Sequence, residues 1–238
     1  MDTSCFENIK AKDNSLPEQV AEQISQLIIE QQLASGDKLP NEFELASQLN
    51  VGRGTIREAV KLLVSRNVLV IRRGLGTYIA SHPGQIKDPL GFTYYPDQVR
   101  LSMDLLEVRA HLEPWVAGMA ALRATEENMS ALRDKCLLVE QDILEGRDHL
   151  PNDVEFHVCI AQCTQNLVVP KLIPVITYAV GLFGKMTGNV LRSETIIDHR
   201  AITDAICARD SALAERMMRQ HLERNRVELE HALQNMSE

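Results

Sequence analysis

The chain lacks the features that mark membrane-spanning and secreted proteins. No apolar run among its 238 residues approaches the ~20 that a membrane span needs. The N-terminus, MDTSCFENIK, has neither the basic region nor the apolar stretch of a signal peptide. The five cysteines are odd in number and lack the spacing of a disulfide framework, which fits a reducing compartment. We therefore expect a cytoplasmic protein with no membrane partner.

Two of these cysteines, Cys159 and Cys163, lie four apart on a predicted helix and could meet a metal. Cysteines in such positions are more often small buried residues. Internal repeats and low-complexity tracts are also missing. An apolar content of 45% supports a real core, and the length suffices for two modest domains.

Positive charge is scarce overall but concentrated in one segment. The formal net charge is −8, with 25 Lys/Arg against 33 Asp/Glu. Residues 51–81 nevertheless hold six basic residues and a single acid, Glu58. Phosphate contacts need local positive charge rather than a basic protein. The segment could therefore bind DNA, while the acidic remainder should suppress indiscriminate DNA binding.

The stretch 39–63, LPNEFELASQLNVGRGTIREAVKLL, has the pattern of two short helices with a tight connection. Asn41 and Glu44 form a capping-box-like pair at its start, and residues 50–52 interrupt it with an Asn and a Gly. Near the start of the second helix, three polar residues lie mostly away from the apolar face: Arg53, Thr55 and Arg57. A helix-turn-helix presents its recognition helix in this way. A plain helical hairpin with a solvated basic face would give the same pattern.

The residues that follow favour the helix-turn-helix. Two short β-branched runs, 68–71 and 77–80, surround a glycine-containing turn, which is typical of a hairpin. The tip of this hairpin is basic and glycine-rich: Arg72, Arg73, Gly74 and Gly76. Together with a leading helix over 16–33, this order predicts a winged helix.

The rest of the chain is predicted to be a linker followed by helices. Residues 82–98 hold three prolines and two glycines without apolar periodicity, as in a linker, with room for a short docked helix. Helices are then expected over 100–124, 126–146, 150–165, 168–190, 194–208 and 210–235. Glu113-Pro114 and Val169-Pro170 should bend or restart helices. The fold class is thus mainly α: a winged helix-turn-helix domain (1–81) with a small β-hairpin wing, a linker (82–98) and an all-α bundle of six or seven helices (99–238).

Four residues of the helical region could meet at one point. Asp153 and His157 lie four apart and share a helix face, while His199 and His221 lie on two further predicted helices. One carboxylate and three imidazoles suit Zn²⁺, Ni²⁺ or Mn²⁺, with one or two coordination positions left open. Each histidine also fits a helix-start or surface role. We assign that role to the remaining four: His82, His111, His149 and His231.

Residues 16–81 resemble the GntR transcription regulators. The resemblance includes the leading helix, a G-D-K-L-P turn, a V-x-R-x-T-x-R-E-A stretch and an R-R-G-x-G-T wing. It implies that the three polar residues of the recognition helix contact DNA in the major groove: Arg53, Thr55 and Arg57. It also implies that Arg73 and Gly74 reach the minor groove, with Arg72 anchoring the wing. Phe43 departs from the family pattern, where an Arg or Glu is usual.

Residues 101–233 resemble the all-helical FCD-type ligand-binding domain of the FadR-like branch of that family. The motifs are L-x-E-V-R-x-x-L-E-P (105–114), D-V-E-F-H (153–157), H-x-x-I-x-x-A-I-x-x-x-D (199–210) and M-x-x-H-L (218–222). The resemblance implies that four residues bind a divalent metal, zinc first and nickel or manganese otherwise: Asp153, His157, His199 and His221. Arg109 matches the family arginine that grips an effector carboxylate. It could instead pair within its helix with Glu113. Thr195 is expected to line the same cavity.

The resulting hypothesis is a homodimeric repressor. Two winged helices would read a palindromic double-stranded DNA operator. A small organic acid held by the metal, such as a sugar acid, lactate or a dicarboxylate, would release it through the 82–98 linker. Two alternatives stay open. One is a helical metal-dependent enzyme with Glu155 or Asp198 as general base, and the other is a DNA-binding protein with a purely structural metal.

Overall fold

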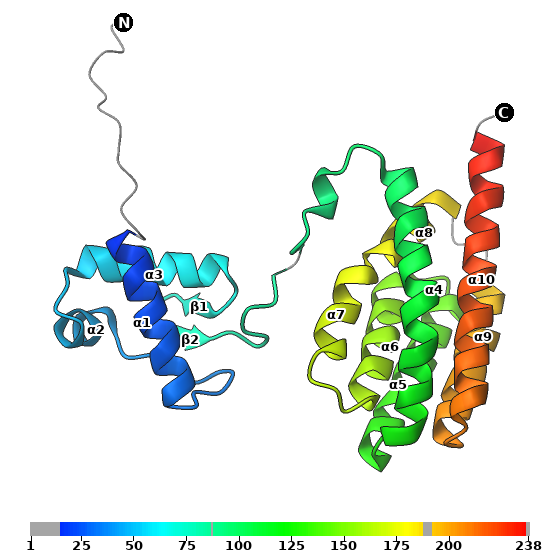
Figure 1. Cartoon of the computed structure of the whole chain (residues 1–238), viewed down its shortest axis with the longest axis horizontal. Coiled ribbons are helices and arrows are strands. Elements are labelled where there is room, and N and C mark those ends of the chain that lie inside the picture. The colour runs from blue at the N-terminus through cyan, green and yellow to red at the C-terminus, as the bar shows by residue number, and fades with distance from the viewer. Residues whose placement is uncertain (1–14, 87, 188–191, 237–238) are drawn as a thin grey trace, which may run out of the picture. The chain divides into compact units, whose positions relative to one another are not determined.

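The structure is a computed structural model that describes residues 15–86, 88–187 and 192–236 (Figure 1). The chain forms two compact units that divide after residue 87. This division falls within the segment that the sequence predicts as a linker.

The first unit holds three helices and a two-stranded hairpin (Figure 1). Its elements are α1 (Leu16–Glu30), α2 (Glu42–Gln48), α3 (Arg53–Ser65), β1 (Leu69–Arg72) and β2 (Gly76–Ile79). The cap predicted for α2 is present: Asn41 Oδ1 accepts from the backbone N–H groups of Phe43 and Glu44, and the Glu44 carboxylate accepts from the Asn41 N–H. Such a cap satisfies N–H groups that a helix start leaves without partners.

Apolar faces of the three helices and the hairpin share one core. The largest fully buried side chains in this core are Ile24, Leu45, Ile56, Leu63, Leu69 and Ile79. The hairpin is antiparallel, with Leu69 opposite Ile79 and Arg72 opposite Gly76. Gly74 and Gly76 have positive φ angles of 74° and 126°, which a glycine adopts without steric cost. The winged helix-turn-helix that the sequence predicts is confirmed.

The second unit is an all-α bundle. Its helices are α4 (Gln98–Arg123), α5 (Glu126–Leu144), α6 (Leu150–Cys163), α7 (Val169–Ile176), α8 (Tyr178–Thr187), α9 (Arg192–Cys207) and α10 (Ser211–Met236). The two longest helices, α4 and α10, pack side by side, and α5 packs against α6 and α9 (Figure 1). The predicted bundle of six or seven helices is therefore confirmed. The predicted segment 168–190 forms α7 and α8, and its last residues, 188–190, lie outside the described part.

Proline acts differently in two of these helices. Pro170 lies in the first turn of α7, where a missing N–H costs nothing because helix starts have free N–H groups. Of the two outcomes predicted at Glu113-Pro114, a bend or a restart, the restart does not occur, since α4 continues through Pro114. Pro114 is buried and followed by the core residues Val116 and Ala117. Packing on both sides of the proline can offset the one lost backbone hydrogen bond.

The predicted linker is attached at both ends. Asn67 Nδ2 donates to the backbone oxygens of His82 (3.0 Å) and Gln85 (2.7 Å), within the first unit. In the second unit a short 3₁₀ helix, η1 (Phe92–Tyr94), packs the Phe92 ring 5.9 Å from that of Tyr178. No helix in the described ranges is long and apolar enough to cross a membrane.

Candidate metal centre and nucleic-acid interface

The start of α3 presents the predicted DNA-contacting residues. Arg53 and Arg57 are exposed and Thr55 is half-buried, while Ile56 and Val60 bury the opposite face of the helix. Arg57 is not free: its Nη2 lies 2.9 Å from Glu42 Oε2 on α2. An exposed pair of this kind contributes little to stability. It can, however, hold the Arg57 guanidinium in one orientation near the N-terminus of α3.

The hairpin tip presents the other predicted DNA contacts. Arg72, at the end of β1, and the turn residues Arg73 and Gly74 are all exposed. The Arg72 guanidinium lies 4.6 Å from the centre of the Tyr78 ring, a cation–π contact that steadies the base of the tip. The first unit thus exposes basic side chains at two places, the start of α3 and the wing.

Phe43 departs from the family pattern and lies in the first turn of α2, where its side chain is 71% exposed. It follows Glu42, the partner of Arg57. The aromatic side chain is therefore exposed at the start of α2 and is not part of the core.

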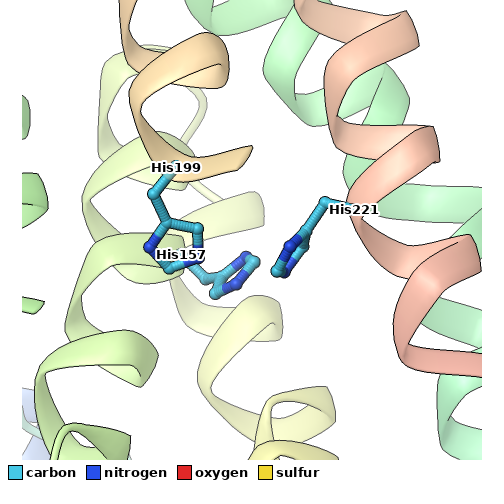
Figure 2. A group of neighbouring side chains, drawn as sticks. All are labelled: His157, His199 and His221. Atoms are coloured by element: carbon cyan, nitrogen blue, oxygen red, sulfur yellow. The ribbon is translucent and has the colours of Figure 1, made fainter. Parts of the chain in front are cut away.

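The second unit brings together three of the four predicted metal ligands. His157 from α6, His199 from α9 and His221 from α10 point toward one another (Figure 2). They offer ring nitrogens that all lie within 4.8 Å of one another. All three are buried, with exposures of 1%, 1% and 3%. We call these residues the histidine triad.

The fourth predicted ligand, Asp153, borders the triad. It lies one turn before His157 on α6 and is also buried. Its Oδ1 is 3.4 Å from His199 Nε2, and its Oδ2 is 3.9 Å from His157 Nε2. The carboxylate therefore approaches the Nε2 side of two of the rings.

The environment of His199 fits a metal ligand. Its ring stacks on that of Phe156, with centroids 4.0 Å apart and planes 16° from parallel. Within the described part of the chain, neither of its ring nitrogens makes a hydrogen bond. Burial, followed by the nearby His221 and His157, holds the pKa of His199 well below its usual value. The ring is therefore neutral and has a lone pair to donate.

Glu113 and Arg109, both on α4, contact His157. Glu113 Oε2 lies 2.5 Å from His157 Nδ1. Arg109 donates from Nε to Glu113 Oε1 at 2.5 Å, and its Nη2 is 3.3 Å from His157 Nε2. Burial raises the pKa of Glu113, but the Arg109 guanidinium and His157 more than offset it and leave the pKa below its usual value. Both interpretations of Arg109 thus have support, since it pairs with Glu113 and also borders the triad.

His221 has polar partners on α9 and α10. Its Nδ1 is 3.5 Å from Asp198 Oδ2, and its Nε2 is 3.3 Å from Asn225 Nδ2. Arg224 Nη1 donates to the other Asp198 oxygen at 2.6 Å. Burial lowers the pKa of His221, although the hydrogen bond to Asp198 acts in the opposite direction. This second imidazole is held neutral as well.

Of the other candidate residues, Thr195 and Asp198 are buried on α9 near the triad, whereas Glu155 is exposed. Thr195 lies one turn before His199. Glu155, a candidate general base, is exposed and lies 3.6 Å from Lys135, away from the triad. The second candidate base, Asp198, is not a solvated helix residue, because it is buried against His221. Cys159 and Cys163 are free, buried members of the hydrophobic core.

The structure adds partners to which the sequence assigned no role at the site. Phe156 holds His199, Asn225 contacts His221, and Glu42 holds Arg57. Glu113 entered only as an in-helix partner of Arg109. Its position in the L-x-E-V-R-x-x-L-E-P motif, one turn from Arg109, indicates the pairing of these two residues. The motif does not indicate that Glu113 also contacts α6.

Comparison with known families agrees with both units. Residues 16–79 match the model "Bacterial regulatory proteins, gntR family", and residues 104–224 match the FCD domain. The proteins of these families and the relatives found are transcription regulators rather than enzymes.

Individual relatives cover nearly the whole chain. A protein of Escherichia coli (strain K12), whose name assigns it to regulation of the L-lactate dehydrogenase operon, is 34% identical over 225 residues, covering 87% of this chain and 83% of the relative. The regulator LutR of Bacillus subtilis (strain 168) is 30% identical over 204 residues, covering 80% and 90%. A solved GntR structure from Streptococcus agalactiae is 39% identical, with a TM-score of 0.77 and coverage of 88% and 98%.

Proposed function

Because the chain belongs to the GntR family of bacterial transcription regulators, with a C-terminal FCD effector-binding domain, we propose that it is a cytoplasmic repressor released from its operator by a small organic acid. The histidine triad is the observation that carries the proposal. Three buried imidazoles, at least two of them held neutral, gather in the unit that follows a DNA-reading head. A buried imidazole cluster of this kind can hold a divalent cation.

The winged helix-turn-helix unit binds double-stranded DNA through two exposed basic surfaces, the start of α3 and the wing. Arg53, Thr55 and Arg57 at the start of α3 read base edges in the major groove, where Arg and Thr donors can distinguish bases. The wing residues then contact the minor groove and the backbone: Arg72, Arg73 and Gly74. The exposure of both places in the structure supports this assignment.

The regulator acts as a homodimer on a palindromic operator, because two identical heads related by a two-fold axis read two identical half-sites. We assign the partner copy to an exposed apolar stripe on α4. Val108, Trp115 and Leu122 lie seven residues apart, on one face of the helix, and are 47%, 45% and 60% exposed. Contiguous exposed apolar side chains of this kind mark interaction surfaces.

The triad and Asp153 hold a divalent cation, with zinc the first choice and nickel or manganese the alternatives. Three imidazoles and one carboxylate are a donor set that these ions prefer. When bound, the cation would supply an electrophilic position for one oxygen of the effector. The protein's own contribution is to hold the rings in a buried site, where burial lowers the pKa of His199 and of His221.

Arg109 grips the effector's carboxylate. Its guanidinium offers donors in a planar fork that matches a carboxylate, and its Nη2 lies 3.3 Å from His157 Nε2. One small molecule can therefore reach both the cation and Arg109. Thr195, buried one turn before His199, lines the same region. A buried site of this kind favours a small acid, and the name of the E. coli relative supports lactate among the candidates.

The effector releases DNA only if it binds one dimer geometry better than the other. The test uses metal-loaded protein and a fluorescent duplex selected from a random pool. Anisotropy is followed while L-lactate, sugar acids and dicarboxylates are added. We expect one acid to release the DNA. His199→Ala should abolish the release and leave DNA binding intact, whereas His231→Ala, at an exposed position on α10, should behave as the parent protein.

Other results would contradict parts of the proposal. If a chelator lowers the melting temperature but no acid alters DNA binding, the metal is structural and the sensing role fails. If selection yields no specific duplex, the assignment of the α3 and wing residues fails.

A further inference from the structure

We propose that two buried carboxylates, Glu113 and Asp198, are positioning residues for the histidine triad. Each lies at Nδ1 of one imidazole. A cation would then bind the Nε2 atoms of His157 and His221 in place of their present contacts with Arg109 and Asn225. The inference rests on the proposed metal site. It adds the residues that decide which nitrogen of each ring is used and how firmly the ring is held.

The contacts of His157 determine where its proton lies. Nε2 is 3.3 Å from Arg109 Nη2, and a guanidinium has donors but no acceptor. Nε2 must therefore accept, which leaves the ring proton on Nδ1. That nitrogen lies 2.5 Å from the Glu113 carboxylate oxygen Oε2, although within the described residues it makes no hydrogen bond of good geometry. Both neighbours thus favour the same tautomer.

His221 follows the same logic with different residues. Its Nδ1 faces Asp198 Oδ2 at 3.5 Å, so a proton on Nδ1 meets a carboxylate. Its Nε2 lies 3.3 Å from the amide nitrogen of Asn225, which is a donor. The proton is again favoured on Nδ1, with the Nε2 lone pair turned away from the carboxylate.

Each carboxylate is itself held by an arginine. Arg109 donates to Glu113 and Arg224 donates to Asp198. Both carboxylates are buried, with Glu113 and Asp198 only 2% and 6% exposed. A buried carboxylate without such a partner would be strongly unfavourable. Each arginine therefore supplies its carboxylate with a charged hydrogen-bond partner.

His199 differs, which makes the triad asymmetric. It stacks on Phe156 and, among the described residues, makes no hydrogen bond through either nitrogen. Its Nε2 lies 3.4 Å from Asp153, a predicted metal ligand, whereas the Nδ1 atoms of His157 and His221 face Glu113 and Asp198. Ligand histidines that donate their second nitrogen to a carboxylate bind metal more tightly, and loss of that partner typically costs about 10–100-fold in affinity.

The first experiment measures zinc affinity by competition with a chromophoric chelator. We expect Glu113→Gln and Asp198→Asn to weaken zinc binding by about 10–100-fold. Two matched controls should stay within about two-fold of the parent protein: Glu155→Gln, exposed on α6 beside Lys135, and Asp204→Asn, exposed on α9. Equal affinity in all four variants would overturn the inference.

A second experiment uses full-length parent protein labelled with ¹⁵N-histidine and does not depend on a variant folding. Long-range ¹H–¹⁵N correlation spectra of the metal-free protein report which ring nitrogen carries the proton. His157→Gln and His221→Gln samples assign the signals. We expect the Nδ1–H tautomer for both rings, and Nε2–H in either would overturn its placement.

The two experiments distinguish a failure of the proposed function from a failure of this inference. A parent protein that binds no divalent metal contradicts the proposed function. The tautomers of His157 and His221 still support or overturn the positioning role of the two carboxylates.

Discussion

Replacing Phe156 by leucine should weaken metal binding as well as lower the stability of the fold. Phe156 is completely buried, and its ring lies flat against that of His199 at 4.0 Å. A near-isosteric apolar exchange in a core usually costs less than about 1.5 kcal/mol. Loss of the ring–ring contact adds about 0.5–1.5 kcal/mol. We therefore expect the free energy of unfolding to fall by about 1–3 kcal/mol.

The effect on metal affinity has a separate cause. The stacked ring gives His199 its orientation, because no hydrogen bond within the described residues does so. Without Phe156 the imidazole gains rotamer freedom that metal binding must remove, at about 0.5–1.5 kcal/mol for one side chain. With about 1.4 kcal/mol per ten-fold change, zinc affinity should fall by about 2–12-fold.

The control is Ile173→Val, in the same core on α7, where Ile173 is 1% exposed. This exchange should cost about 0.5–1.5 kcal/mol of stability and leave zinc affinity unchanged. Urea denaturation gives the stability, and chelator competition gives the affinity. The reasoning is refuted if Phe156→Leu loses stability but keeps parental affinity, or if Ile173→Val weakens zinc binding equally.

Three further predictions concern other parts of the chain. Arg57→Ala should weaken specific DNA binding by about 1–3 kcal/mol and relax base preference at one operator position, which anisotropy with single-base operator variants measures. Trp115→Glu should convert the dimer to monomer in sedimentation velocity, because a charge replaces the central apolar side chain of the α4 stripe; an unchanged sedimentation coefficient would exclude this interface. Hydrogen bonding from Asn152, then from Arg147, lowers the pKa of Asp142. Its stabilising contribution is therefore present above the unfolded pKa of about 4 and lost as pH falls below it, so Asp142→Asn should flatten the dependence of urea midpoints on pH in that range.

Local signals predict much of the fold. The Asn41–Glu44 capping box, for example, involves residues only three apart, and the structure contains it as expected. The break between α7 and α8 could not be predicted in the same way. Residues 172–182 are almost wholly apolar, so neither composition nor periodicity indicates an end at Ile176. Packing of the two short helices against different neighbours decides it.

The candidate site, too, was predictable where it depends on local spacing and not where it depends on contacts between helices. The Asp153–His157 spacing identifies a shared helix face, and the structure places both residues at the triad. The partners of the triad come from other helices: Arg109 and His157 are 48 positions apart. No local pattern reports a contact over that separation. Phe156 adds a further difficulty, because beside a histidine in a sequence it resembles any core residue.

The charges around the triad argue that this core is built for binding and not for stability. Arg109, Glu113, Asp153 and Asp198 are all less than 10% exposed, although apolar residues of similar volume would often be as stabilising or more so. The interpretation of Arg109 as a simple in-helix pair assumed a solvent-exposed helix surface, where such a pair contributes a few tenths of a kcal/mol. In the interior the same pair carries a desolvation cost that stability alone does not explain. Local rules are broken in this way mainly at functional sites, which favours a pocket that recognises an ion and an acid.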